Sequence, residues 1–509
     1  MGIQLVWLKR DLRLRDHAPL AEAAQRGPVC VLYLYEPPLW QRDEHDASHL
    51  HAVNSALVEL DEGLRSLGGR ITYRMGRPVP TLRTLHAALA DHGGIEAIWS
   101  HQETGLGWTF SRDRAVTAWA REQGIAWHQL GQDGVCRPHP RRDGWASRWT
   151  EAMARPLVPV PGRIEDVGSV VSGWPHHGPR TASELGMAPT TADLQALQPV
   201  GEAAAIALLD DFLAGRGRGY RQALSSPNSA WNGCSRLSVH LAWGTLSTRT
   251  AWQHTRLTMR ALQGSRTPES RSFLDDLEAF EGRLRWRGHF MQKLEDAPRL
   301  EHENLHHAVD GVRERVFDDA KFQAWAEGRT GWPLVDACMR ALERERWVNF
   351  RMRAMLMSVA SYPLWLHWRR PAVHLASRFL DFEPGIHFPQ VQMQAGTTGI
   401  NSLQIYDPDK QARDHDRDGA FIRRWVPELA GVPDAFIHVP YRMDRVSQQR
   451  AGCVLGRDYP LPLVDHRRAS ALARRKLEEV RRRAAAREES RDIHQRHGSR
   501  MPASRRRWR

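Results

Sequence analysis

The sequence predicts an α/β domain with a Rossmann-like parallel sheet, followed by a mostly α-helical domain. Short apolar runs alternate with amphipathic stretches over the first 130 residues. The chain is then rich in Pro and Gly to about residue 200, and beyond that point apolar residues recur with helical spacing. A length of 509 residues allows about two to four domains and a large core.

Five apolar runs are the strand candidates of the first domain. They are IQLVWL (3–8), VCVLYLY (29–35), ITYRM (71–75), EAIWS (96–100) and IAWHQL (125–130). Because the apolar residues are continuous, we expect a parallel sheet buried on both faces. A helical pattern over residues 49–68 separates the second run from the third. No G-x-G-x-x-G follows the first run, so the ordinary dinucleotide-binding fingerprint is absent.

Composition sets the remaining domain boundaries. We expect the α/β domain over residues 1–130, a connector without long regular elements over 131–200, and the helical domain over 201–465. Residues 466–509 carry 16 Lys and Arg against 5 Asp and Glu, which is +11 of the chain's net +13. This tail is predicted to be a basic helix that frays into disorder. It is either a non-specific phosphate binder or a solvated extension.

Several classes of protein are disfavoured. No apolar segment follows Met1 and no run approaches the ~20 apolar residues that span a bilayer, so we expect a cytoplasmic monomer with no membrane role. The five cysteines lie about a hundred residues apart and form no C-x-x-C. Neither a disulfide framework nor a zinc or iron–sulfur site is therefore predicted, and no metal site is expected.

One polar stretch precedes an apolar helical run. Ser235, Arg236 and Ser238 place hydroxyls and a guanidinium where a helix N-terminus favours phosphate. The same pattern is also typical of an ordinary helix cap.

A second stretch calls for a buried ion pair. Residues 347–359 form an apolar helical pattern that contains Arg353, and a buried guanidinium needs a carboxylate. Asp381 and Glu383 can supply one, either as a structural ion pair or as part of a site.

In a third stretch, Arg283 and Trp286 are three residues apart, so one helix face can stack a base and hold phosphate. A single Trp on a helix is more often core.

Together these stretches resemble the photolyase and cryptochrome family of flavoproteins. The resemblance lies in VWLKRDLRLRDHAPL (6–20), CSRLSVHLAWGTLS (234–247), TGWPLVDACMRAL (330–342) and YDPDKQARDHDRDGAFIRRWVPEL (406–429), which occur in the family's order. It spans about residues 3 to 440. The resemblance implies an antenna α/β domain, a connector and a helical domain that binds FAD.

Carried over residue by residue, the resemblance implies a set of FAD-binding residues. They are Tyr220, Ser235, Arg236, Leu237, Ser238, Arg287, Arg353, Asp381, Glu383 and His387. Those from 220 to 238 would line the pyrophosphate, with Arg287 close by, and Arg353 and Asp381 would flank the isoalloxazine ring. His387 stands where repair enzymes place Asn opposite flavin N5, and its charge can change near neutral pH. Gln390, Gln392 and Gln394 would offer neutral partners to the ring carbonyls.

The family repairs DNA with light, which implies UV-damaged DNA as the partner. An excited, reduced flavin passes an electron to a flipped pyrimidine dimer, and Trp286 matches the aromatic residue that stacks on that dimer. Arg283 and Phe350 would be further DNA contacts, although they stand where cyclobutane-dimer enzymes have a carboxylate and an Asn. Trp368 matches the middle member of the electron relay, whereas Val391 and Glu314 occupy the regions of the other two.

Two functions stay open at this point. One is a FAD-dependent photolyase that repairs pyrimidine dimers, and the other is a cryptochrome-like blue-light photoreceptor that binds FAD without repair. An antenna pigment of the folate or deazaflavin type is possible near Glu103 and Arg112, where the alternative is a solvated loop.

Overall fold

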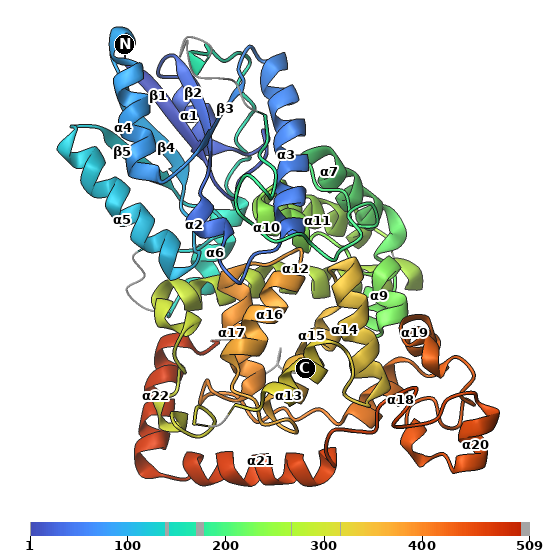
Figure 1. The fold of residues 1–509 in the computed structure, drawn as a ribbon. Helices are drawn as coiled ribbons and strands as arrows, with labels where there is room; N and C mark the ends of the chain where they lie inside the picture. Colours follow the sequence, from blue (N-terminus) through green and yellow to red (C-terminus); the bar gives the residue numbers. More distant parts are fainter. Residues whose placement is uncertain (1, 138–141, 169–177, 266, 316, 500–509) are drawn as a thin grey trace.

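The computed structural model describes residues 2–137, 142–168, 178–265, 267–315 and 317–499. A sheet with flanking helices forms the N-terminal half, and the rest of the chain is almost entirely helical (Figure 1). Among the described residues, none of the helices combines the length and apolarity that crossing a bilayer requires.

The N-terminal sheet confirms the predicted fold class and strands. Its strands are β1 (Ile3–Leu8), β2 (Val29–Tyr35), β3 (Ile71–Met75), β4 (Ile95–His101) and β5 (Ala126–Leu130). All pairs are parallel, in the order β3-β2-β1-β4-β5. The order reverses direction between β1 and β4, so their carboxyl ends open a crevice at the edge facing the helical half.

Helices cover both faces of this sheet. They are α1 (Ala18–Ala24), α2 (Pro37–Trp40), α3 (Ala47–Ser66), α4 (Pro78–Ala88) and α5 (Gly107–Glu122). Apolar residues of α1 and α3 pack with Val6 and Val31, whereas those of α4 and α5 pack with Leu5 and Leu32. Adjacent strand residues therefore point into different layers, which is why the runs are apolar without alternation. Helix α3 begins two residues before the predicted pattern because the Asp46 side chain caps it.

The helical half is built around long buried helices. In chain order they are α7 (Glu202–Asp211), α8 (Tyr220–Ala223), α9 (Pro227–Gly233), α10 (Ser238–Trp243), α11 (Thr248–Gln263), α12 (Pro268–Asp296), α13 (Asp319–Ala326), α14 (Pro333–Glu345), α15 (Phe350–Ser361), α16 (Arg369–Arg378), α17 (Pro384–Ala395), α18 (Pro408–His415), α19 (Ala420–Trp425), α20 (Arg445–Arg450), α21 (His466–Arg481) and α22 (Ala484–His497). Helices α12, α15 and α17 pack together at the centre. Of the predicted site residues, these three helices carry Arg283, Trp286, Arg287, Phe350, Arg353 and His387.

The predicted connector contains more regular structure than its composition indicates. Helix α6 (Trp145–Ala154) lies within it and buries Trp145, Trp149 and Met153 against the core of the helical half. Those apolar residues recur every four positions, so one face of the segment can pack even though Pro and Gly surround it. The part of the connector at 138–141 and 169–177 lies outside the described residues. The domain boundaries stay predictions.

The tail is folded where the expectation was a fraying helix. Helices α21 and α22 bury Ala473, Leu477, Val480 and Ile493 against the helical half. The expected basic helix is confirmed, and it continues in helical structure to residue 497 instead of fraying, because these apolar residues, few among many arginines, recur with the spacing of one helix face. Residues 500–509 lie outside the described part of the chain.

Candidate functional site

A two-point ion pair joins α15 to the segment before α17. The Arg353 Nη1 and Nη2 atoms lie 2.8 and 2.9 Å from the two carboxylate oxygens of Asp381. The Arg353 Nε donates to the Val348 carbonyl, and its guanidinium lies 4.2 Å from the Phe379 ring centre. Burial raises the pKa of Asp381, but Arg353 more than offsets this and holds the pKa below its ordinary value. Asp381 is therefore ionised at neutral pH, and the pairing expected from the sequence is confirmed.

The predicted phosphate segment reaches the same ion pair. Arg236 has a φ of 59°, which turns the chain sharply just before α10. The turn brings the Ser238 hydroxyl, at the first position of α10, into a hydrogen bond with Asp381. Residues more than a hundred positions apart in the chain thus meet at one carboxylate.

The Arg236 side chain fills the space beside this segment. Its guanidinium carbon lies 3.7 Å from the Trp231 ring centre and 3.8 Å from that of Trp347. The Nε donates to Gln198 at 3.2 Å, whereas Nη1 is buried and has no hydrogen-bond partner among the described residues. Burial lowers the pKa of Arg236 to about 10, so the group remains a cation at neutral pH.

Three other members of the predicted pyrophosphate set differ in exposure. Tyr220 is buried among Phe212 and Phe280, and its hydroxyl hydrogen-bonds Arg283. Leu237 is fully buried and belongs to the apolar core. Ser235 is half-buried and accepts the Leu237 amide at 3.5 Å. Of these three residues, Ser235 is the one whose hydroxyl lies in the turn before α10.

The second carboxylate of the acidic pair has its own partner. Glu383 lies 3.0 Å from Arg287 of α12, which also donates to the Leu241 carbonyl at 2.8 Å. Asp381 thus pairs with Arg353 of α15, whereas Glu383 pairs with Arg287 of α12. A cleft with about 370 Å³ of empty space, part of it open solvent, reaches Arg287 and Glu383 from the sheet half.

His387 differs from its expected behaviour. It is buried on α17, and its Nε2 lies 2.8 Å from the Ala372 carbonyl. Burial lowers the pKa of His387 to about 4. The expectation that its charge changes near neutral pH is therefore wrong for this structure, because the ring has no solvent to stabilise the proton.

The glutamines lie on a helix, so they do not share one face. Gln392 donates to the Leu300 and Glu303 carbonyls at 3.0 and 2.6 Å and accepts the Leu305 amide at 2.8 Å. Its interpretation as a neutral partner for a ring is wrong, because these backbone groups satisfy its amide. Gln390 and Gln394 are four residues apart on the same helical face, and each keeps a buried Oε1 without a partner among the described residues.

The predicted DNA contacts form a partly exposed aromatic surface. Trp286 on α12 is half-buried and stacks on Phe290, with ring centres 5.5 Å apart and planes tilted by 29°. Arg283 is exposed one turn earlier, and its guanidinium lies 5.5 Å from the ring centre of Phe350. Phe350 is 43% exposed, which is unusual for so large an apolar side chain. The structure thus brings Arg283 and Phe350 together, with Trp286 one turn further along α12.

Trp368 lies in the interior at the start of α16. It is fully buried, and its indole Nε1 donates to Asn304 at 2.7 Å. Glu314 accepts from the same Asn304 at 2.8 Å, and Val391 is buried on α17. Trp368 is therefore placed among polar partners rather than between two further tryptophans at the expected positions.

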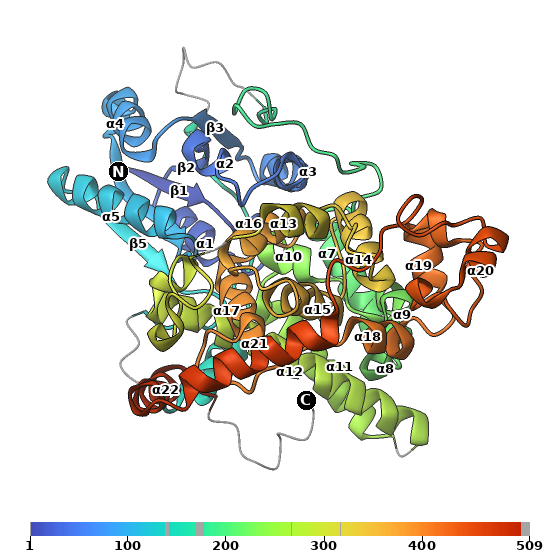
Figure 2. The same cartoon turned by 60° about the horizontal axis from the view of Figure 1, so that its bottom comes forward.

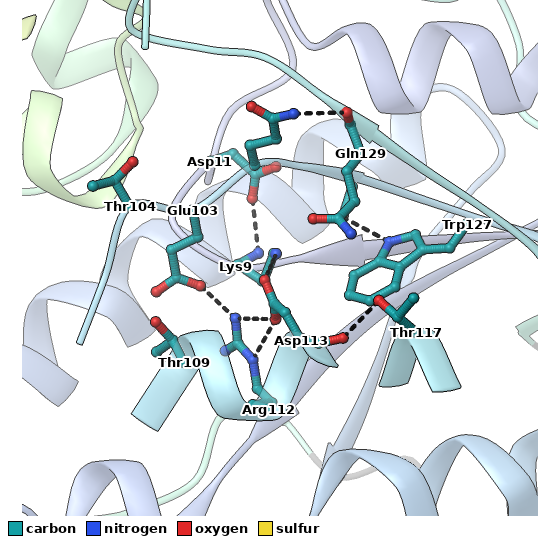
Figure 3. Close-up of polar contacts among 12 residues, drawn as sticks. Lys9, Asp11, Glu103, Thr104, Thr109, Arg112, Asp113, Thr117, Trp127 and Gln129 are labelled. Carbon is teal, nitrogen blue, oxygen red and sulfur yellow. Dashed lines mark hydrogen bonds and ion pairs between the residues drawn. The ribbon is translucent and has the colours of Figure 1, made fainter. Parts of the chain in front are cut away.

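The predicted antenna residues belong to a buried ionic cluster at the carboxyl ends of β2 and β4. Arg112 of α5 lies 2.6 Å from Glu103 and 2.8 Å from Asp113, and Figure 3 shows these three side chains together. It also lies 3.0 Å from Glu36. Burial raises the pKa of Glu36 to about 7 although Arg112 opposes the shift, and the Glu36 Oε2 atom has no hydrogen-bond partner among the described residues. A cleft with about 560 Å³ of empty space, part of it open solvent, borders the cluster. The solvated-loop alternative is wrong, because Glu103 and Arg112 are both buried.

Two residues of these sites, Trp231 and Glu36, were not predicted from the sequence. Trp231 covers Arg236, and its only signal is an isolated aromatic five residues before that arginine. Glu36 joins Arg112 across 76 positions, and no local pattern connects them. Both contacts depend on packing between segments that the sequence does not place relative to one another.

The donor set at Arg353 and Asp381 fits a dinucleotide. It offers a half-buried guanidinium paired with a buried carboxylate, the hydroxyls of Ser235 and Ser238, and the Nη1 of Arg236, which has no partner among the described residues. Cationic and hydroxyl donors at a turn before a helix suit a pyrophosphate, and a paired arginine suits a ring whose charge changes on reduction.

Comparison with known proteins agrees with this donor set. The family model for DNA photolyase matches residues 4–141, and that for the FAD binding domain of DNA photolyase matches residues 280–479. A deoxyribodipyrimidine photo-lyase of Agrobacterium fabrum is 28% identical over 91% of this chain and 95% of its own. A cryptochrome DASH of Natronomonas pharaonis is 27% identical over 91% of this chain and 98% of its own.

A solved structure shows the same architecture. The crystal structure of a bacterial class III photolyase from Agrobacterium tumefaciens superimposes with a TM-score of 0.80 at 25% identity. The match covers 95% of this chain and 98% of the other. The helical half is thus an FAD-binding domain of the photolyase type, and the chain belongs to the photolyase and cryptochrome family.

Proposed function

We propose that this protein is a light-driven, FAD-dependent photolyase that repairs UV-induced pyrimidine dimers in DNA. The observation that carries the proposal is the position of Trp286. It is a half-buried aromatic residue on α12, directly before Arg287 and one turn after the exposed Arg283, whose guanidinium contacts Phe350. One helix therefore presents a stacking surface and a predicted cofactor residue at adjacent positions.

Each residue of the site has a distinct part in this reaction. When bound, FAD supplies the light-excited electron donor. Arg353 and Asp381 would hold the cofactor's ring with an ion pair whose two charges cancel. Trp286 stacks on the flipped dimer, and Arg283 holds a neighbouring phosphate. Phe350 keeps water from the lesion side because its ring is the apolar group exposed there.

Replacing Trp286 with alanine tests this assignment. Base–aromatic stacking is worth about 1–3 kcal/mol, so Trp286→Ala is expected to weaken binding of a dimer-containing oligonucleotide by about 5- to 150-fold. Its repair rate in light at subsaturating DNA falls by the same factor. Trp425→Ala is the matched control, because Trp425 is also partly exposed but packs with Phe421 and Arg424 on α19, outside the site. Equal lesion affinity in the wild type and Trp286→Ala would contradict the assignment.

A cryptochrome-like photoreceptor is the second candidate. It is favoured by the lesion surface, where Arg283 and Phe350 replace groups that cyclobutane-dimer enzymes use. The curated relatives include proteins named for both functions at similar identity. Control of the flavin's redox state by His387 would support this candidate.

His387 gives a test that separates the two candidates by pH. With its pKa lowered to about 4, His387 is neutral from pH 6 to 8. The lifetime of the photoreduced flavin is therefore expected to be the same across that range in the wild type. A lifetime that varies between pH 6 and 8 in the wild type but not in His387→Asn would favour signalling.

A further inference from the structure

We propose that the outer face of α21 is a second contact surface for the phosphate backbone of duplex DNA, beside the lesion surface. This face, called the α21 basic face here, consists of Arg467, Arg468, Arg474, Arg475 and Arg482, all exposed. The proposal rests on the proposed function in taking DNA as the polyanion. It adds a surface outside the cofactor and lesion sites.

Helical spacing separates the cations of α21 from its buried side. His466, Ala473, Leu477 and Val480 are buried at intervals of three, four and seven residues. At 100° per residue these four lie within about 60° of one another, and the cations lie on the opposite side. The sequence thus places all five charges where α21 faces solvent.

Most of this charge is not neutralised by the protein. Glu478 and Glu479 are the acids of α21 beside these cations. Glu478 lies 3.8 Å from Arg474 and 4.0 Å from Arg482, at the outer limit of an ion pair, and Glu479 is exposed four residues after Arg475. Within the described part of the chain, Arg467, Arg468 and Arg475 form no ion pair. Positions 467, 474 and 482 are seven and eight residues apart, so the cations recur about every 10–12 Å along one helix. Such a row suits successive backbone phosphates better than a single small anion.

The face is held on a rigid support. Ala473, Leu477 and Val480 pack on Tyr362 and Val309. The Arg481 guanidinium, between the two sides, donates to the Asn401 carbonyl at 2.8 Å and to the Gly396 carbonyl at 3.2 Å. The helix that carries the cations therefore need not be ordered when a ligand binds, which removes a cost that a flexible tail would incur.

The two tail helices rest on the helices that carry the predicted lesion contacts. Tyr362 lies at the end of α15, about 18 Å along its axis from Phe350, and Ile493 of α22 packs with Leu294 of α12, about 12 Å from Trp286. Figure 1 shows α21 at the end of the helical half that lies away from the sheet, and Figure 2 shows it crossing in front of that half. One turn of B-DNA is about 34 Å long, so a duplex with its dimer at Trp286 has flanking phosphates within this range.

The composition of the face favours nucleic acid over a membrane. A helix that lies in a lipid surface needs a broad apolar face, usually with Trp, Phe or Leu, to enter the acyl region. The apolar side of α21 is already buried in the protein, and Leu472, at 41% exposure, is its large exposed apolar residue.

The test neutralises the face and measures the salt dependence of binding. The variant replaces Arg467, Arg468, Arg474 and Arg475 with glutamine in the full, FAD-loaded chain. Binding to an undamaged duplex of about 30 base pairs is followed in the dark by fluorescence anisotropy from 50 to 200 mM KCl. Each lost phosphate contact lowers the slope of log K against log salt by about 0.9, so we expect the slope to fall by about 2 to 4.

A matched control carries the same change in charge elsewhere. Arg77, Arg83, Arg114 and Arg121 are exposed in the sheet half, and their replacement by glutamine is expected to change the slope by less than about 1. Equal slopes in the wild type and the α21 variant, or equal losses in the two variants, would overturn the proposal. So would an α21 variant that keeps its duplex slope but loses binding to phosphatidylserine vesicles.

The same preparations separate this proposal from the proposed function. Because the duplex is undamaged and the measurement is made in the dark, neither lesion recognition nor photochemistry contributes to it. A change in slope without any repair in light would support the α21 basic face and contradict the photolyase. Repair in light with unchanged slopes would support the photolyase and contradict the α21 basic face.

Discussion

Replacing Arg353 with leucine is expected to lower the free energy of unfolding by about 3–5 kcal/mol and to release FAD. The reason is that Asp381, whose side chain is 3% exposed, would remain as a buried charge without its guanidinium. Chemical denaturation measures the first effect, and the ratio of flavin absorbance to protein absorbance after gel filtration measures the second.

A matched ion pair gives the control. Arg340 pairs with Glu428 through one nitrogen: its Nη1 lies 2.9 Å from both carboxylate oxygens, and its Nε donates to the Gly328 carbonyl. The two side chains are 22% and 30% exposed, so Arg340→Leu is expected to cost at most about 1 kcal/mol and to leave the flavin bound. Equal flavin content in the two variants would show that the Arg353 pair is only structural.

Replacing Arg112 with leucine is expected to destabilise the sheet half by about 3–5 kcal/mol at pH 8. Glu36, Glu103 and Asp113 would then share a buried site without their common cation. The loss is expected to be smaller at pH 6. Glu36 has a pKa raised to about 7 by burial, so it is mostly protonated there and the charge left unpaired is smaller.

The sign of this pH dependence follows from the raised pKa. A carboxyl with a folded pKa above its ordinary value costs stability as the pH rises through the folded value, so Glu36→Gln is expected to stabilise the protein more at pH 8 than at pH 6. Arg114→Leu, an exposed change on the same helix, serves as the control and is expected to stay within about 0.5 kcal/mol. A loss in Arg112→Leu that is identical at both pH values would contradict the assignment.

Local patterns predicted the elements well. The five apolar runs became the five strands because parallel strands are buried on both faces and therefore read as continuous apolar segments. The tail was harder to predict. Ala473, Leu477 and Val480 are few among many arginines, so composition indicated disorder although their spacing fits one helical face.

The site shows where local reasoning stops. The need of Arg353 for a carboxylate could be inferred from its buried helix, and Asp381 supplies it. The sequence could not show that Glu383 pairs with Arg287, because this contact depends on how α12 packs against α17. The behaviour of His387 also depends on packing, since the surrounding protein excludes the solvent that would stabilise its proton.

Photorepair is the most direct test of the function proposed here. A dimer-containing oligonucleotide is incubated with the FAD-loaded protein in a four-way design, with flavin reduced or oxidised and with blue light or darkness. Dimers are expected to disappear only when the flavin is reduced and the light is on. Dimers that persist in that sample at the level of the dark control would contradict the account.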